Sequence, residues 1–369
     1  MTDTAQDFIL SGLKRLNGGT RDILIRNGRI AEIAPGGSLS GESRIDCSDY
    51  YVSSGWIDLH VHAFPEFDPY GDDIDEIGIK SGVTTIVDAG SCGADRIADL
   101  VALGEQATTH LLAFLNISRI GLKRIDELSH LGWIDEQKLT RAIDTFKTSI
   151  VGLKVRMSQS VVGKSGIRPL SLARALSETT ELPLMVHIGS APPSVDEILP
   201  YLKQGDVITH YLNGKSNGLF CENGEPRQVL RAALHRGVHL DVGHGSASFS
   251  FKVAEAAKAH HIGLHTISTD IYRHNRLNGP VYNMANVLSK FLYLGYTLAD
   301  VIAAVTTHAA DWLRKPELGR IQVGAPANLT LFTVKDEPIT LIDSEGEERI
   351  GTKRIEAQGV VINGTFIKC

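Results

Sequence analysis

The chain has 369 residues, of which 43% are apolar and 22% charged, and its formal net charge is −6. This composition is typical of a soluble globular protein with a large core. The negative net charge argues against nucleic acid or an anionic membrane surface as a partner.

The N-terminal sequence MTDTAQDFIL lacks the basic segment and apolar core of a signal peptide, and no apolar run is long enough to span a bilayer. The four cysteines, Cys47, Cys92, Cys221 and Cys369, are scattered without a CxxC spacing. This usage favours a reducing compartment and argues against a disulfide framework or a cysteine-based zinc site. We therefore expect a cytoplasmic protein without a membrane partner.

Both ends of the chain have the pattern of short strands and turns. The first fifty residues hold three strand-like runs separated by glycine turns, at 8–16, 22–33 and 43–52. The last fifty residues show the same pattern at 319–334, 340–351 and 359–368. We expect residues 1–52 and 317–369 to form one small β-sandwich domain built from both termini.

Between these ends, short apolar runs alternate with helical patterns. Eight runs are expected to be strands: 56–62, 83–90, 111–118, 151–158, 183–189, 207–214, 238–245 and 264–271. Segments with apolar residues at three-to-four spacing lie between them, and a long helical tract follows at 282–315. Strand followed by helix, eight times, predicts a (β/α)8 TIM barrel over residues 53–316. A doubly wound open sheet is the alternative, but no G-x-G-x-x-G motif follows the first strand.

Metal-ligand residue types stand at the ends of five expected strands. They are His60 and His62 on the first, Lys154 on the fourth, His187 on the fifth, His210 on the sixth and Asp270 on the eighth. In such a barrel the C-terminal strand ends converge on one site. Histidine nitrogen and carboxylate oxygen suit Zn²⁺ and related divalent ions. Six candidates exceed one tetrahedral zinc and favour a site with two metal ions.

Lys154 is an unusual member of this set, because an ammonium group would repel metal ions. Burial in a positive site lowers the pKa of a lysine and favours its neutral amine. A neutral amine can take up CO₂ and become a carbamate, an anion able to bridge two ions. The charge argument permits this modification.

The pattern HVH, lysine, histidine, histidine, aspartate on strands one, four, five, six and eight resembles the amidohydrolase superfamily in its binuclear form. The stretches GWIDLHVHAFP, KVRMS and ISTDI most resemble its deacetylase-like, or dihydroorotase-like, members. The resemblance covers nearly the whole chain, including the two-part β domain.

The resemblance implies ligand roles for all six residues. His60, His62 and Asp270 would bind the first ion and His187 and His210 the second, with carbamylated Lys154 bridging both. Zinc is the expected metal, although manganese and iron can share such ligands. A metal-bridging hydroxide would be the nucleophile, with Asp270 as proton shuttle.

These features predict a metal-dependent hydrolase that cleaves an acyl ester or amide of a small carboxylated substrate, as a deacetylase does. A cyclic amidase of the dihydroorotase or hydantoinase type is the first alternative. An adenine-type deaminase is the second, and Lys154 argues against it. A non-catalytic relative is the third, and the complete ligand set argues against it. Assembly into a homo-oligomer is left open.

Two further residues are weaker candidates for substrate binding. Arg156 follows Lys154 on the same face of the strand, where it would grip a substrate carboxylate or pair with an acid such as Asp88. His244 follows the seventh strand on the active face and is expected to touch the substrate.

Overall fold

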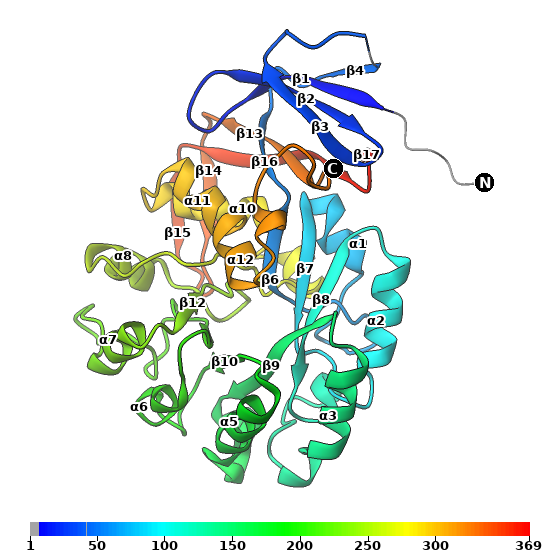
Figure 1. The fold of residues 1–369 in the computed structure, drawn as a ribbon. Helices are drawn as coiled ribbons and strands as arrows, with labels where there is room; N and C mark the ends of the chain where they lie inside the picture. The colour runs from blue at the N-terminus through cyan, green and yellow to red at the C-terminus, as the bar shows by residue number, and fades with distance from the viewer. Residues whose placement is uncertain (1–6, 42) are drawn as a thin grey trace.

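A computed structural model describes residues 7–41 and 43–369. Its centre is a sheet of seven parallel strands, each hydrogen-bonded to the next in chain order (Figure 1). They are β6 (Trp56–Val61), β7 (Val83–Ala89), β8 (His110–Asn116), β9 (Ile150–Met157), β10 (Leu184–Ile188), β11 (Val207–Thr209) and β12 (His239–Asp241). Their almost complete burial matches their apolar sequences, because helices cover the outside of a parallel barrel.

The eighth barrel position differs from the prediction of a regular strand at 264–271. This segment makes only isolated bridges, Asp241↔Thr266 to β12 and Val61↔Ile271 to β6. Asp270 has φ of +50°, a left-handed conformation that interrupts an extended ladder. The segment nevertheless closes the barrel, and the TIM-barrel prediction is confirmed with seven regular strands.

Helices surround the barrel in the order expected from the apolar spacing. They include α1 (Ile74–Ile77), α2 (Ile97–Gln106), α3 (Glu136–Thr145), α4 (Gln159–Val162), α5 (Arg168–Thr180), α6 (Val195–Ile198), α7 (Gln228–His235), α8 (Phe251–Ala259) and α9 (Arg273–Asn278). In α3, Asp135 caps the N-terminus, and Leu139, Ala142 and Ile143 face the core at three-to-four spacing.

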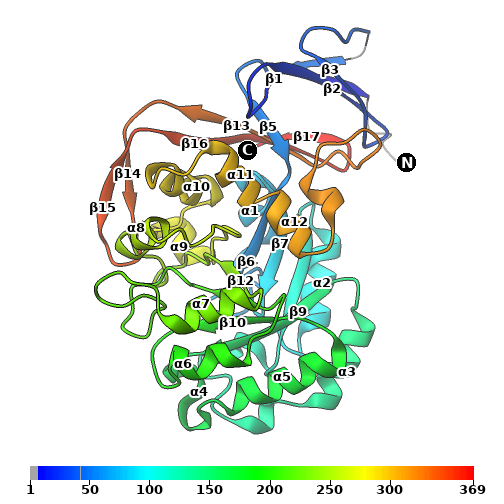
Figure 2. The same ribbon diagram turned by 60° about the vertical axis from the view of Figure 1, so that its left-hand side comes forward.

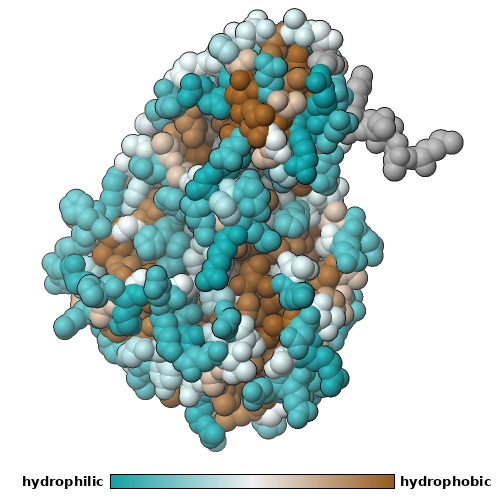
Figure 3. Space-filling model, in the orientation of Figure 1, coloured by the Kyte–Doolittle hydropathy of each residue, from teal (hydrophilic) through white to brown (hydrophobic). Residues whose placement is uncertain are grey.

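The long tract at 282–315 forms three helices rather than one. They are α10 (Met284–Tyr293), α11 (Leu298–Ala304) and α12 (Thr307–Trp312). Gly295 ends the first with φ of +80°, and Thr297 caps the second with its hydroxyl. Within the described residues, none of the helices combines the length and apolar character needed to cross a bilayer. Figure 3 shows apolar side chains in separate patches among polar ones on one face.

Strands from both termini form one eight-stranded sheet, which confirms the predicted two-part β domain. Its order is β17 (Thr365–Lys368), β16 (Arg354–Ile362), β13 (Leu329–Lys335), β5 (Tyr51–Ser54), β1 (Phe8–Lys14), β2 (Thr20–Arg26) and β3 (Arg29–Pro35), with β4 (Ser43–Asp46) beside β1. Leu10 of β1 and Leu331 of β13 share one apolar core, which joins the two ends of the chain.

A separate hairpin leaves this sheet and runs along the side of the barrel. It consists of β14 (Ile339–Ile342) and β15 (Glu348–Gly351), paired antiparallel. Figure 2 shows it next to α10, with its tip directed toward α8. The hairpin therefore brings C-terminal residues down to the barrel loops.

Candidate active site

The six residues predicted as metal ligands lie together at the C-terminal ends of the barrel strands. Five of them line a cavity of about 240 Å³: His60, His62, Lys154, His187 and Asp270. The sixth, His210, packs against this group, with its ring centroid 5.0 Å from that of His60 and 4.4 Å from that of His187. The barrel therefore brings together residues spread over more than 200 positions of the sequence.

The polar atoms of this group are close enough to share bound ions. The Nε2 atoms of His60 and His62 lie 3.4 and 3.2 Å from Oδ1 of Asp270. Lys154 Nζ is 3.1 Å from His60 Nε2. One potential ligand atom from each of His60, His210 and Asp270 lies within 4.8 Å of the others. Such a set of nitrogen and oxygen donors fits a divalent metal ion.

Hydrogen bonds around His60 determine which nitrogen faces the centre. Its Nδ1 lies 2.8 Å from Thr209 Oγ1, whose hydroxyl donates to Asp241 Oδ2 over 2.8 Å. Because the hydroxyl proton goes to the carboxylate, His60 Nδ1 donates and Nε2 carries a lone pair. Burial raises the pKa of Asp241 to about 6, with hydrogen bonds from Ser268 and Thr209 opposing the shift. Asp241 is therefore mostly ionised at pH 7 and keeps His60 in this tautomer.

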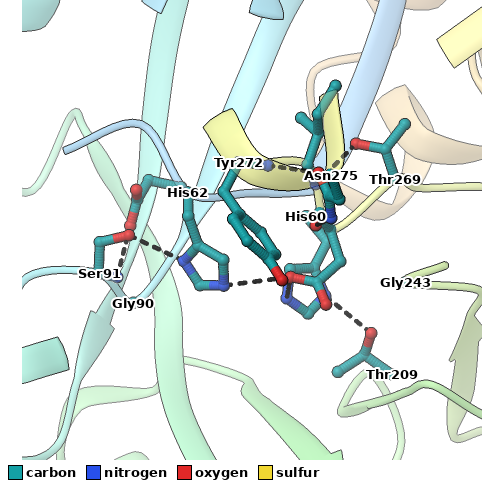
Figure 4. Close-up of polar contacts among 12 residues, drawn as sticks. His60, His62, Gly90, Ser91, Thr209, Gly243, Thr269, Tyr272 and Asn275 are labelled. Atoms are coloured by element: carbon teal, nitrogen blue, oxygen red, sulfur yellow. Dashed lines mark hydrogen bonds and ion pairs between the residues drawn. The ribbon is translucent and has the colours of Figure 1, made fainter. Parts of the chain in front are cut away.

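His62 is oriented from the opposite side of the site (Figure 4). Its Nδ1 lies 2.8 Å from Ser91 Oγ. Asp88 holds the surrounding backbone, accepting from Ala63 N at 2.8 Å and Ser91 N at 2.7 Å. Asp88 therefore supports His62 and is not the partner of Arg156.

The two ring nitrogens of His210 differ in their surroundings. Its Nδ1 donates to the carbonyl oxygen of Gly243 over 2.6 Å, so Nε2 carries a lone pair. This Nε2 is buried without a hydrogen-bond partner among the described residues. Burial lowers the pKa of His210 to about 3, and it also lowers the pKa values of His60 and His187. All three rings are therefore neutral at pH 7, the form that binds metal.

Lys154 lines the cavity and is only 1% exposed. Gly90 makes room for it, because a Cβ there would lie 2.5 Å from Lys154 Cβ. Burial lowers the pKa of Lys154 to about 7, with the charge of Asp270 opposing the shift. In a large fraction of the molecules Lys154 is therefore a neutral amine at physiological pH.

Arg156 lines the cavity, and its structural partner differs from the acid suggested by the sequence. Its Nη1 lies 3.4 and 3.3 Å from the two carboxylate oxygens of buried Glu127. Its guanidinium also lies 5.8 Å from the centre of the Tyr70 ring. Asp88 faces the backbone beside His62 instead, because its two oxygens are taken up by amides.

His244 lies outside the cavity, so the expected substrate contact needs correction. Its ring is buried and stacks on Phe249, with centroids 4.5 Å apart. Lys290 Nζ lies 2.7 Å from its Nε2, and Gly245 O lies 2.9 Å from its Nδ1. With both nitrogens engaged in the protein interior, His244 has no atom directed at a substrate.

Several residues that line the cavity were not among the sequence candidates. They are Tyr70, Leu122, Ser158, Ser160, Ser190, Lys215, Ser246, Ala247, Ser248 and Tyr272. Lys215 had a usable signal, because it follows His210 by five residues in the loop after β11. Tyr70 and Tyr272 had none, since their contact at 5.2 Å between ring centroids joins two distant loops.

Comparisons with known sequences show which family the chain belongs to. The family described as a deacetylase-like composite domain matches residues 321–367. A deacetylase from Enterococcus faecalis is 40% identical over 361 residues, which cover 97% of this chain and 98% of the relative. A deacetylase from Agrobacterium fabrum is 36% identical over 356 residues, covering 94% and 86%.

Two solved structures are similar over almost their entire length. One is described as an adenine deaminase, with a TM-score of 0.94, 39% identity, and coverage of 99% of this chain and 100% of that chain. The other is described as a dihydroorotase, with a TM-score of 0.92, 34% identity, and coverage of 98% and 99%. The names differ in substrate, whereas the fold is shared.

Proposed function

Because the chain belongs to the deacetylase-like family of the amidohydrolase superfamily, whose members are metal-dependent hydrolases, we propose that it removes an acyl group from a small carboxylated ester or amide. The observation that carries the proposal is the convergence of six ligand-type side chains below one small cavity. The two cationic side chains on the cavity wall, Arg156 and Lys215, supply the preference for a carboxylate.

The chemistry of the donors fits two divalent ions. His60, His62 and Asp270 would hold one ion and His187 and His210 the other, with Lys154 between them. The orphaned Nε2 of buried His210 supports this assignment, because an unpaired polar atom in the interior costs free energy unless a ligand satisfies it. Zinc is the metal that a histidine-rich set of this kind favours.

Lys154 would enter the site as a carbamate. Its neutral amine attacks CO₂, an N–C bond forms, one C=O π bond opens, and one proton leaves to solvent. The low pKa of about 7 supports this step, because the nucleophile is the unprotonated amine. The resulting anion would offset the positive charge of the ions.

Asp270 would carry the proton during hydrolysis. Bound divalent ions supply Lewis acidity, which acidifies water and polarises a carbonyl group. Burial alone would raise the pKa of Asp270, but hydrogen bonding from His62 and the other basic side chains around it outweigh this effect and lower the pKa. The carboxylate is therefore free to accept a proton from the attacking water and to deliver it to the leaving oxygen or nitrogen.

The cavity wall would select the substrate. Arg156 is tied to Glu127 through one nitrogen, which leaves other N–H donors for a carboxylate. Among the described residues no group bonds to the Lys215 ammonium, and its backbone N–H donates to Asn213 Oδ1 over 3.1 Å. That contact fixes the loop in which Lys215 approaches the cavity. The volume of about 240 Å³ limits the substrate to a small molecule.

The first experiment combines metal content with substrate turnover. Protein purified without chelator is analysed for metal and then assayed with N-acetyl amino acids, O-acetyl 2-hydroxy acids, dihydroorotate, a hydantoin and adenine. Close to two ions per chain and release of acetate are expected. Ring opening of dihydroorotate or the hydantoin would replace the deacetylase proposal with a cyclic amidase. Ammonia from adenine would replace it with a deaminase.

The carboxylate preference is tested separately. In Arg156→Met or Lys215→Met, kcat/KM for the acetylated acid should fall about 10-fold or more, because a charge-assisted hydrogen bond contributes about 1.5–3 kcal/mol. The methyl ester of the same acid should be affected much less. Lys164→Met is the control, since Lys164 is exposed and lies outside the cavity lining. Equal losses on acid and ester would contradict the assignment.

A further inference from the structure

One short turn touches two of the candidate metal ligands at once. Gly243 offers its carbonyl oxygen to His210 Nδ1 at 2.6 Å. Two residues later, the backbone of Gly245 lies against the other ligand, since a Cβ there would approach Asp270 Oδ2 to 2.4 Å. The position of this 243–245 turn therefore determines how both ligands are oriented.

The turn is attached to the barrel by its backbone. Gly243 N donates to Ser268 Oγ over 2.9 Å, and His244 N donates to Ser268 O over 3.1 Å. Gly245 N donates to Thr269 O over 2.9 Å. These bonds use the three backbone N–H groups of the turn. Its carbonyl oxygens and the His244 side chain contact other parts of the protein.

The other side of the turn is held by the β14–β15 hairpin. Ser344, in the hairpin tip at 343–347, places its Oγ 3.3 Å from His244 O and 3.0 Å from Gly245 O. The same hydroxyl accepts from Phe249 N at 3.2 Å. Glu345 accepts from Ser250 Oγ over 2.7 Å, which attaches the tip to the end of the same loop.

Lys290 of α10 connects the turn and the hairpin through the interior. Its Nζ lies 2.7 Å from His244 Nε2, 2.6 Å from Ile342 O and 2.9 Å from Pro280 O. These three acceptors match the three protons of an ammonium group. Lys290 is 0% exposed, so losing any of these bonds would leave polar atoms without water to replace them.

We infer that the β14–β15 hairpin, acting through Ser344 and the Lys290–His244 contact, is a positioning element of the metal centre. None of these residues touches the cavity; they act through the turn that orients His210 and Asp270. The C-terminal hairpin thereby has a positioning role in a site that is built on the barrel. The inference rests on the proposed function, because it concerns the same metal site.

The test compares Ser344→Ala and Lys290→Met with Ile350→Ala, an exposed position on the same hairpin that takes no part in these contacts. Removing support for a metal ligand commonly costs 10–100-fold in metal affinity or activity. Both variants should therefore bind Co²⁺ about 10–100-fold more weakly, with a changed visible spectrum of the cobalt protein. Their kcat should fall while KM stays within about twofold, because the proposed carboxylate-binding side chains, Arg156 and Lys215, are unchanged.

Folded variants with the cobalt affinity and spectrum of the wild type would overturn the inference. If Lys290→Met does not fold, Ser344→Ala decides, because its part-buried hydroxyl is a milder loss. A wild type that takes up no metal would overturn the proposed function and the inference with it. Normal metal uptake by the wild type beside unaffected variants would overturn the inference alone.

Discussion

Replacing Thr209 by valine tests whether the support of His60 controls metal binding. Valine has nearly the same shape and suits a buried strand, so the change removes little beyond the hydroxyl. The lost group accepts from His60 Nδ1 at 2.8 Å and donates to Asp241 Oδ2 at 2.8 Å. Asp241 keeps donors from Ser268 and Thr266, whereas His60 Nδ1–H keeps none at hydrogen-bond distance.

The magnitude follows from this imbalance. One buried donor without a partner costs about 1–3 kcal/mol. A lost contact to a metal-binding histidine costs about 10–100-fold in affinity, which is about 1.4–2.8 kcal/mol. The two estimates agree, so Thr209→Val should weaken metal binding by about one to two orders of magnitude. Thr209→Ser, which keeps the hydroxyl, should bind metal nearly as the wild type does.

Competition with a chromophoric chelator measures the affinity, and urea unfolding of the metal-free protein measures stability. Metal affinity within about twofold of the wild type in Thr209→Val would show that the hydroxyl does not control metal binding. That result would mean that Asp241, whose Oδ2 is 3.7 Å from His60 Nδ1, moves in and replaces the hydroxyl.

Three further changes probe other parts of the site. Burial raises the pKa of Glu127 from 4.5 to about 7. Between these two pH values the folded state therefore holds more protons than the unfolded state. The contribution of Glu127 to stability falls as the pH rises through this range. The free energy of unfolding of the wild type minus that of Glu127→Gln should therefore drop by up to about 3 kcal/mol from pH 4.5 to 7 in urea titrations; a flat difference would contradict this. Gly90→Ala should lower stability and metal content more than the control Gly19→Ala does. Both glycines have a positive φ, but only a Cβ at Gly90 would meet Lys154. Equal losses in the two variants would contradict a role for the contact with Lys154. Asp270→Asn should fold normally and lose about 10²–10⁴-fold in kcat, and full turnover would exclude it as the proton carrier.

The barrel, the two-part β domain and the grouping of the six ligand-type residues could all be predicted from the amino-acid sequence. Strand-helix alternation and apolar spacing are local properties, and a barrel places every C-terminal strand end on the same face. His60, Lys154, His187 and His210 could therefore be predicted to lie in one site from the sequence alone. The resemblance to a known superfamily added the expected roles, which spacing alone leaves open.

Other features depend on contacts between distant segments. The irregular eighth position results from the left-handed backbone of Asp270, and no local pattern announces it. Glu127, on the loop between β8 and α3, pairs with Arg156 of β9, and the sequence spacing did not predict this contact. His244 follows its strand in the expected place, but its ring points inward to Lys290, some 46 positions away.

The surroundings of the ligand-type residues could not be predicted in this way. Hydrogen bonds of side chains depend on distances of a few tenths of an ångström, which are set by packing and not by sequence separation. The hairpin illustrates this: its sequence predicts two strands and a turn, but only the fold brings Ser344 to the turn beside Asp270. Residue types and their order decided which chemistry is available, and packing decided which atoms face one another.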